Sequence, residues 1–239
     1  MTSGEQATPR TPRERARAQT MADITRIGRA HLIEHGADGL SLRAVARDLG
    51  VVSSAVYRYV RSRDELLTML VVDGYNELGE AVEQAVRTVP DTDFAGQFRA
   101  LGWAVRDWAR REPARYGLLF GTPVPGYQAP AEQTTGPGTR VIVALIGIIE
   151  RAYRAGSISP REAPTPATGL VADCARIADE FGLSAPATVL TRGMFAWASL
   201  FGIVTFEVFD QYGPGTLTDP TELFAHHLDV LVETMGLGG

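Results

Sequence analysis

The sequence predicts an all-α fold, and three observations support this. Apolar residues recur every three or four positions through most of the 239-residue chain, which is the period of an amphipathic helix. Proline and glycine cluster between these segments, where helices begin and end. The apolar run over 141–149 could by composition be a strand, but no second strand signal accompanies it. We therefore interpret it as part of a buried helix over 139–155.

The first nineteen residues are rich in Pro, Thr and Arg and lack aromatic residues and helical periodicity. Such a segment cannot bury a core, so we predict a disordered basic arm over 1–19. The arm could follow a nucleic-acid backbone, or it could be a solvated tail. The spacing of Ile24, Ile27 and Ile33 then predicts a first helix over 20–35.

Residues 41–63 have the pattern of two short helices that meet at a tight turn. Leu42, Val45 and Leu49 share one face of the first helix, and Gly50 follows as a left-handed residue that ends it. The second helix leaves hydroxyl, phenol and guanidinium groups facing outward. Such groups donate to phosphate oxygens, and arginine can pair with a guanine edge. The stretch is therefore a helix-turn-helix candidate, although any small helical domain has an apolar face and a polar one.

The distribution of charge along the chain agrees with this interpretation. The net charge of the whole chain is −5. Residues 1–63 hold eleven arginines and six acidic residues, giving +5, whereas the remainder carries −10. Basic charge is therefore concentrated where phosphates would be met.

The same stretch resembles the DNA-binding domain of the tetracycline-repressor (TetR) family of transcriptional regulators. That family shares a helix, Gly-Val, four or five small or polar residues, and then Tyr-x-His-Phe-x-x-Lys. Here Gly50-Val51 is followed at matching spacing by YRYVRSR over 57–63. Tyr59 stands in place of the His and keeps a hydrogen-bond donor, while Val60 replaces the Phe and leaves a smaller core contact.

The resemblance also implies which side chains meet DNA. Arg63 replaces the Lys and keeps its charge, and Val52 stands where a serine cap is common, so we expect the cap at Ser53. Arg43 would pair with guanine, whereas Tyr59 and Arg63 would hold phosphates. The predicted DNA contacts are Ser41, Arg43, Ser53, Ser54, Tyr57, Arg58, Tyr59 and Arg63.

A long helix links this part of the chain to the rest. Ser62 and Glu65 form a capping box ahead of a helical pattern of about 25 residues, which would span about 37 Å. Such a helix can join a DNA-binding part to a second domain. The predicted domains are a disordered basic arm over 1–19, a helix-turn-helix domain over 20–65, and an effector-binding and dimerisation domain over 66–239.

The second domain is predicted to be a helical bundle. Helices over 93–110 and 114–120 precede a Pro- and Gly-rich loop over 121–138, which is either a lid or disordered. Two long helices begin near Pro186 and Pro220, and their apolar stripes exceed what one domain can hide. We therefore predict a homodimer that joins two copies of this pair in a four-helix bundle.

The resemblance implies that the middle helices of this domain enclose a small-molecule effector. Trp197, Phe201 and Gly202 resemble a C-terminal subgroup marked by Trp and then His-Gly, with Phe201 in place of the His. Loss of that polar group favours an apolar effector. The predicted effector-binding residues are Trp103, Phe120, Tyr127, Ile146, Cys174 and Phe195.

Other classes of protein have little support in the sequence. Cys174 is the only cysteine, and His31 and His35 have metal-binding spacing but no evident third ligand, so we predict neither metal nor cofactor. We find no catalytic motif of an enzyme. No apolar run approaches about 18 residues and the N-terminus has no apolar signal region, so we expect a cytoplasmic protein without membrane association.

Together these features predict a regulator that responds to a ligand. We expect a repressor released from a palindromic, double-stranded DNA operator by a small, largely apolar effector. The alternatives are a DNA-organising protein without effector and, with less support, a helical-bundle enzyme.

Overall fold

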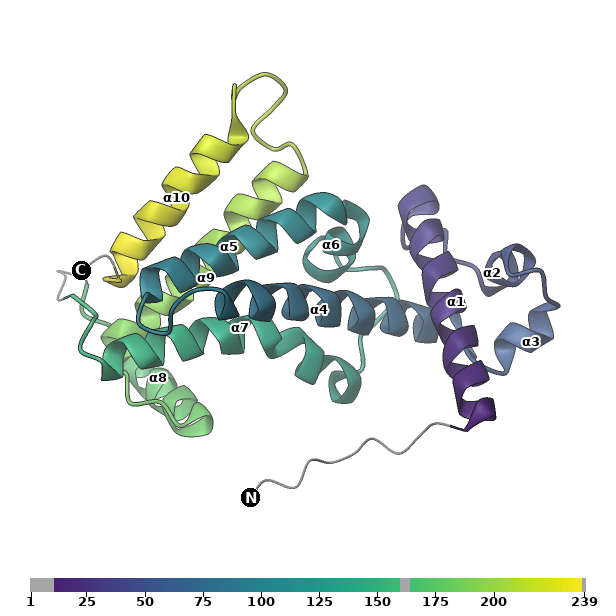
Figure 1. The fold of residues 1–239 in the computed structure, drawn as a ribbon, viewed down its shortest axis with the longest axis horizontal. Coiled ribbons are helices and arrows are strands. Elements are labelled where there is room, and N and C mark those ends of the chain that lie inside the picture. The colour runs from purple at the N-terminus through teal and green to yellow at the C-terminus, as the bar shows by residue number, and fades with distance from the viewer. Residues whose placement is uncertain (1–10, 160–163, 238–239) are drawn as a thin grey trace.

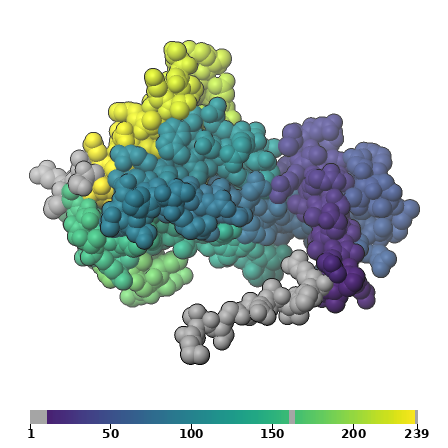
Figure 2. Space-filling model, viewed as in Figure 1, coloured from purple at the N-terminus to yellow at the C-terminus, as the bar shows by residue number. Residues whose placement is uncertain are grey.

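The computed structural model describes residues 11–159 and 164–237, and over those ranges the protein is all-α, as the sequence predicts (Figure 1). Helices α1 to α3 form a lobe at one end of the molecule, and the space-filling view shows this lobe in direct contact with the larger remainder (Figure 2). The helices of this smaller lobe are α1 (Pro12–His35), α2 (Leu42–Asp48) and α3 (Ser53–Tyr57).

Helix α4 (Arg63–Arg87) runs from the small lobe into the larger one and packs along α5 and α7. The hydroxyl of Ser62 accepts a hydrogen bond from the backbone N–H of Glu65, so the predicted helix start is confirmed. The larger lobe contains α5 (Phe94–Arg111), α6 (Pro113–Phe120), α7 (Ala131–Arg154), α8 (Thr168–Phe181), α9 (Ala187–Val208) and α10 (Pro220–Met235).

The prediction of a disordered arm over 1–19 is wrong for residues 12–19, which belong to α1. Thr11 and Glu14 form a reciprocal capping box, and Pro12 occupies the first helical position. Together they start the helix eight residues before the predicted start at residue 20. The first ten residues of the predicted arm lie outside the described residues.

The predicted loop over 121–138 is also too long, because α7 begins at Ala131 and contains Pro137. Contacts with α4 hold the part of α7 that follows Pro137. Gly138 lies against the ring of Tyr75, where an added Cβ would meet a ring carbon at 3.3 Å. Arg140 pairs with Glu83 of α4 at 2.8 Å. Tertiary packing therefore outweighs the low helix propensity of proline and glycine in this segment.

Each lobe has its own apolar core, and the boundary between the two cores lies inside α4. The core of the small lobe includes Leu66, Leu67 and Leu70, so it continues five residues past the predicted domain boundary at 65. Val60, which stands where the TetR pattern that the sequence resembles has Phe, is fully buried in this core. The small lobe and the start of α4 therefore pack as one unit.

Helix α9 is long and apolar enough, by length and composition alone, to cross a membrane. It contains no long unbroken apolar run, because small and polar residues such as Arg192 and Gly193 interrupt its sequence. A third of its most apolar segment is buried inside the structure. Its outer face exposes Phe195 and Phe206, at 56% and 46%.

Candidate functional sites

In the turn between α2 and α3, the conformation of Gly50 agrees with the prediction, but the residue that caps α3 does not. Gly50 adopts a left-handed conformation, with φ of 73°, as expected for the residue that ends α2. Val52 is extended, and its carbonyl accepts from the N–H of Ala55 at 2.9 Å, so Val52 itself is the cap of α3. The expectation that the cap moves to Ser53 is wrong: Ser53 is the first helical residue.

The predicted DNA-contacting side chains mostly lie at the surface of the small lobe. Arg43, Ser54, Tyr57 and Arg58 are exposed, while the buried Val56 anchors α3 in the core. The partly buried members of the set are Ser41, Ser53, Tyr59 and Arg63. The outward face of α2 and α3 therefore offers the guanidinium, hydroxyl and phenol groups that the sequence predicts.

Arg63 has a structural role that its sequence position did not reveal. Its Nη2 donates to the carbonyl of Ala37 at 2.9 Å and to Asp38 at 3.3 Å. Its guanidinium therefore holds the connection between α1 and α2. A phosphate contact by Arg63 would add to these bonds or compete with them.

His31, considered as a metal ligand from its spacing to His35, is buried and lies beside the last residue of α2. Its Nε2 and Oδ2 of Asp48 are 2.6 Å apart. Hydrogen bonds from His31 and then Arg47 lower the pKa of Asp48 below its ordinary value. This pair fastens α1 to the helix-turn-helix, a role for which the spacing of His31 gave no signal.

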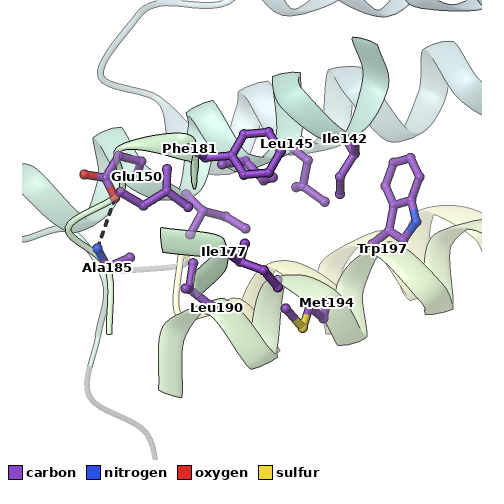
Figure 3. A pocket seen from close by; sticks show the side chains of 13 residues that line it. Ile142, Leu145, Glu150, Ile177, Phe181, Ala185, Leu190, Met194 and Trp197 are labelled. Carbon is purple, nitrogen blue, oxygen red and sulfur yellow. Dashed lines mark hydrogen bonds between the residues drawn. The ribbon is translucent and has the colours of Figure 1, made fainter. Parts of the chain in front are cut away.

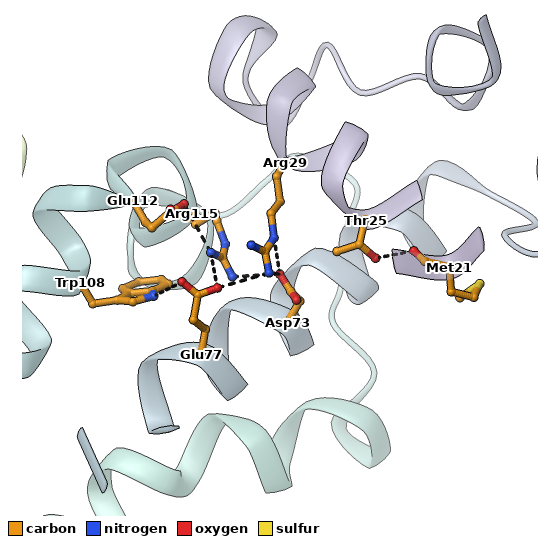
Figure 4. A network of polar contacts seen from close by, with 8 residues as sticks. All are labelled: Met21, Thr25, Arg29, Asp73, Glu77, Trp108, Glu112 and Arg115. Carbon is orange, nitrogen blue, oxygen red and sulfur yellow. Dashed lines mark hydrogen bonds and ion pairs between the residues drawn. The ribbon is translucent and has the colours of Figure 1, made fainter. Parts of the chain in front are cut away.

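An ion-pair network joins the two lobes where α1, α4 and α6 meet (Figure 4). Asp73 and Glu77 lie about one turn apart on α4. Arg29 of α1 donates to Asp73 at 2.7 Å and lies 3.2 Å from Glu77. Arg115 of α6 is fully buried and donates to Glu77 at 2.8 Å and to Asp73 at 2.9 Å. Glu77 also accepts from the indole N–H of Trp108 at 3.2 Å.

The connection after α6 supplies another contact between the lobes. The hydroxyl of Tyr127 lies 3.0 Å from that of Thr68 on α4, and its ring packs against the core of the small lobe. Leu118 and Val124 pack against the same core. Tyr127, predicted to contact an effector, therefore lies at the boundary between the lobes.

The opposite side of α6 contacts α9 through a chain of aromatic rings. Trp197 and Phe201 of α9 have ring centroids 4.3 Å apart, and Phe201 and Phe120 of α6 are 4.6 Å apart. Tyr116 of α6 donates to the carbonyl of Phe201 at 3.2 Å. Helix α6 therefore contacts α9 on one side and, through Arg115, the carboxylates of α4 on the other.

A cavity of about 260 Å³ lies between α7, α8 and α9 (Figure 3). This volume is just below the range of roughly 300–1,000 Å³ that is usual for small-molecule pockets. Within α8 only Cys174 is buried, so this wall packs loosely on the rest of the lobe. The lining includes Ile142, Ile146, Ile177, Phe181, Met194 and Trp197.

Glu150 is the one charged side chain among the described residues of this lining, and protein groups satisfy its carboxylate. It accepts from the backbone N–H groups of Ser184 at 2.9 Å and Ala185 at 3.1 Å, and it pairs with Arg154. Burial alone would raise the pKa of Glu150, but these hydrogen bonds outweigh it and hold the pKa below its ordinary value. The carboxylate turns toward Ala185 at the edge of the cavity, so the interior is left apolar (Figure 3).

The cavity brings together few of the residues predicted to bind an effector. Of the predicted six, Ile146 lines it. Cys174 is buried in the core of the larger lobe, and Phe195 faces outward on α9. The ring of Trp103 packs on Phe224 of α10, with centroids 4.9 Å apart. Phe120 of α6 packs on Phe201 of α9, and Tyr127, in the connection after α6, contacts Thr68 of α4.

Both lobes match models of known protein families. Residues 24–70 match the model described as bacterial regulatory proteins of the tetR family. Residues 98–231 match the model described as the tetracyclin repressor-like C-terminal domain. The first match contains the helix-turn-helix. The second runs from α5 into α10 and includes the helices that line the cavity.

Similar proteins cover almost the whole chain. HTH-type transcriptional regulators of Mycobacterium bovis and Mycobacterium tuberculosis are each 44% identical over 225 residues, spanning 93% of this chain and 95% of their own. The crystal structure of the regulatory protein SCO4313 superposes with a TM-score of 0.75 at 31% identity, covering 93% of this chain and 100% of its own. The TetR-family regulator PfmR of Thermus thermophilus, with a TM-score of 0.57 at 15% identity over 88% of this chain and 97% of its own, shares the fold.

Proposed function

This chain belongs to the TetR family of DNA-binding transcriptional regulators, and we propose that it is a repressor that a small, largely apolar effector releases from a palindromic operator. The observation that carries the proposal is the apolar cavity together with the contacts that lead from its wall to the small lobe. In this proposal the protein acts in the cytoplasm, where operator and effector would both reach it.

The cavity favours a compact, apolar effector. Its interior is lined by aliphatic and aromatic side chains, and Glu150 makes its hydrogen bonds to the protein. Among the described residues, the cavity lining offers a ligand carboxylate no cationic side chain, and the nearby Arg154 already pairs with Glu150. A neutral apolar compound would gain from burial of its surface, at about 25 cal/mol per Å².

The contacts of α6 support a route from this cavity to DNA. Trp197 lines the cavity, and a ligand that displaces its ring would press on Phe201 and, through it, on Phe120 of α6. A shift of α6 would move Arg115 against carboxylates that also hold Arg29 of α1. Each step in this route is a direct contact between side chains. Both effector binding in the cavity and DNA binding at the small lobe would therefore act on the position of α6.

A homodimer would place two small lobes on one operator. Phe195 and Phe206 of α9 and Val230 of α10 are exposed, and a second copy of α9 and α10 would cover them. Two helix-turn-helix units about 34–36 Å apart then fit a palindrome in successive major grooves. Effector binding would favour a dimer in which this spacing is wrong.

Selection of bound DNA from a random pool at defined salt gives the first test. We expect an inverted repeat, with half-sites separated by about one helical turn. Effector candidates are then screened by the shift in thermal unfolding that they cause. Because binding free energies are linked, operator DNA must weaken effector binding by the same factor by which the effector weakens operator binding.

A pair of variants on one helix tests the cavity itself. Ile146→Trp should fill the cavity, abolish the effector-induced thermal shift and leave operator binding intact. Val143→Trp places the same ring on the exposed face of α7 and should keep the response. Equal effector affinity with and without operator would contradict the linkage. If no ligand changes the DNA binding of the protein, the alternative of a DNA-organising protein without effector would hold instead.

A further inference from the structure

Helix α1 begins twelve residues before the segment that matches the DNA-binding model of the family. Its first part, residues 12–23, is about 18 Å long and projects beside α3, beyond the core of the small lobe (Figure 1). The capping box of Thr11 and Glu14 fixes where it starts. The small lobe therefore has a helical extension, residues 12–23, here called the α1 extension.

The residue pattern of α1 changes where the helix leaves the core. Ile24 and Ile27 are buried against the small lobe. Arg17 and Arg13 precede Ile24 by seven and eleven residues, spacings that keep all three on one face of the helix. The face that carries isoleucine inside the lobe thus carries arginine along the extension. Arg15, at about 200° from either arginine, lies on the opposite face.

A contact places this arginine face next to the residues that follow α3. The guanidinium carbon of Arg17 lies 5.4 Å from the centre of the Tyr59 ring, a cation–π distance. Tyr59 lies two residues after the end of α3 and is one of the residues expected to meet phosphate. Arg17 therefore lies beside the surface that faces DNA, and Arg13 lies one turn farther out on the same face.

These arginines are not engaged by acidic groups. Within residues 11–159 and 164–237, neither Arg13, Arg15 nor Arg17 has a carboxylate partner, and all three are exposed. Glu14 instead accepts the backbone N–H of Thr11. By contrast, Arg26 and Arg29 on the same helix pair with Asp23 and Asp73. The positive charge of the extension is thus available to an anionic partner.

We propose that the face of the α1 extension formed by Arg13 and Arg17 binds the phosphate backbone of DNA outside the bases that the helix-turn-helix reads. The proposal relies on the DNA-binding role of the family and is independent of any effector. Phosphate contacts carry no sequence information, so the extension would add affinity for every duplex and leave base preference unchanged.

The test compares three proteins as full chains: the wild type, the Arg13→Ala/Arg17→Ala double variant, and Arg15→Ala as the matched control from the opposite face. Affinity for the selected operator and for an unrelated duplex is measured by fluorescence anisotropy over a series of salt concentrations. Each lost phosphate contact lowers the magnitude of the slope of log affinity against log salt by about 0.9. The slope of the double variant should therefore be smaller in magnitude by about 1.8 for each small lobe bound to DNA. Arg15→Ala should keep the wild-type slope.

The unrelated duplex makes the test independent of the operator proposal, because the slope should fall on both DNAs. Alanine is the best helix former, so thermal unfolding should change little in all three proteins. Ethylation interference should lose its outermost phosphates in the double variant only. An unchanged slope in the double variant, an equal loss in Arg15→Ala, or an altered base preference would each overturn the proposal.

Discussion

Arg29 of α1 and Arg115 of α6 donate to the same carboxylate oxygen, Oδ2 of Asp73, at 2.7 and 2.9 Å. The two arginines come from different lobes, and Asp73 lies on the helix that runs through both. Glu77, the next acidic residue on that face of α4, is 3.2 Å from Arg29 and 2.8 Å from Arg115. Two cations therefore share two anions, and displacement of either arginine changes the bonds that remain for the other.

Arg115→Met should destabilise the protein strongly. The variant fills the same space but leaves Asp73, Glu77 and Glu112 without their buried cation. Breaking a buried pair costs about 3–5 kcal/mol, and because these carboxylates are partly exposed we expect about 3 kcal/mol. Urea unfolding measures the loss. The matched control is Arg111→Met, which is exposed and should stay within about 0.5 kcal/mol of wild type. Similar losses in both variants would show that Arg115 is no more than a surface charge.

Stability should decrease in acid partly through Glu77. Burial raises the pKa of Glu77, but Arg115 and Arg29 outweigh burial and hold it below its ordinary value of 4.5. A carboxyl whose pKa is lower in the folded state stabilises the protein above its unfolded pKa, and this contribution is lost as pH falls through the folded pKa. The free energy of unfolding, measured from pH 6 down to pH 3, should fall less steeply in Glu77→Gln. Parallel curves for the two proteins would contradict this role.

Tyr116 should make stability depend on pH at the alkaline end. Burial raises its pKa from 10.0 to about 12, against a smaller opposite effect of the hydrogen bond with Thr205. The unfolded chain then loses this proton first, so the contribution is present below pH 10 and is lost as pH rises toward 12. Between pH 9 and pH 11.5, wild type should lose about 2 kcal/mol more than Tyr116→Phe. Comparing the change with pH cancels the constant cost of the lost hydrogen bonds. Equal losses would mean that Tyr116 ionises freely when folded.

Arg43→Ala and Arg63→Ala should differ in their effect on DNA recognition. Arg43 is exposed on α2, and its loss should relax specificity at one base pair per half-site by about 1–3 kcal/mol. Arg63→Ala should weaken all sequences alike, and it should also lower thermal stability because the bond to the carbonyl of Ala37 is lost. Affinities for a set of single-base operator variants, with thermal melts, separate the two effects. If both variants act uniformly on all sequences, the assigned roles are wrong.

Local signals in the sequence predicted the elements whose ends are fixed by neighbouring residues. The start of α4 at Ser62 and the left-handed Gly50 depend on hydrogen bonds and backbone conformation within a few residues, so their positions could be recognised directly. The start of α1 carried the same kind of signal in Thr11, Pro12 and Glu14. The prediction began this helix at residue 20 because residues 12–19 have no apolar periodicity. Only a helix that packs against a core needs such a pattern, and this part of α1 is exposed.

The sequence by itself determined the all-α class, the family, the helix-turn-helix and its outward polar residues, because helical period and short motifs are local properties. The tertiary structure alone decided that α7 includes Pro137, that Arg63 holds Ala37, and that Arg29 and Arg115 meet at Asp73. It also decided the cavity, where Ile142, Ile177 and Trp197 converge from three helices. These contacts join residues far apart in the chain, and the angles at which helices pack, which set such contacts, leave no periodic trace in the sequence.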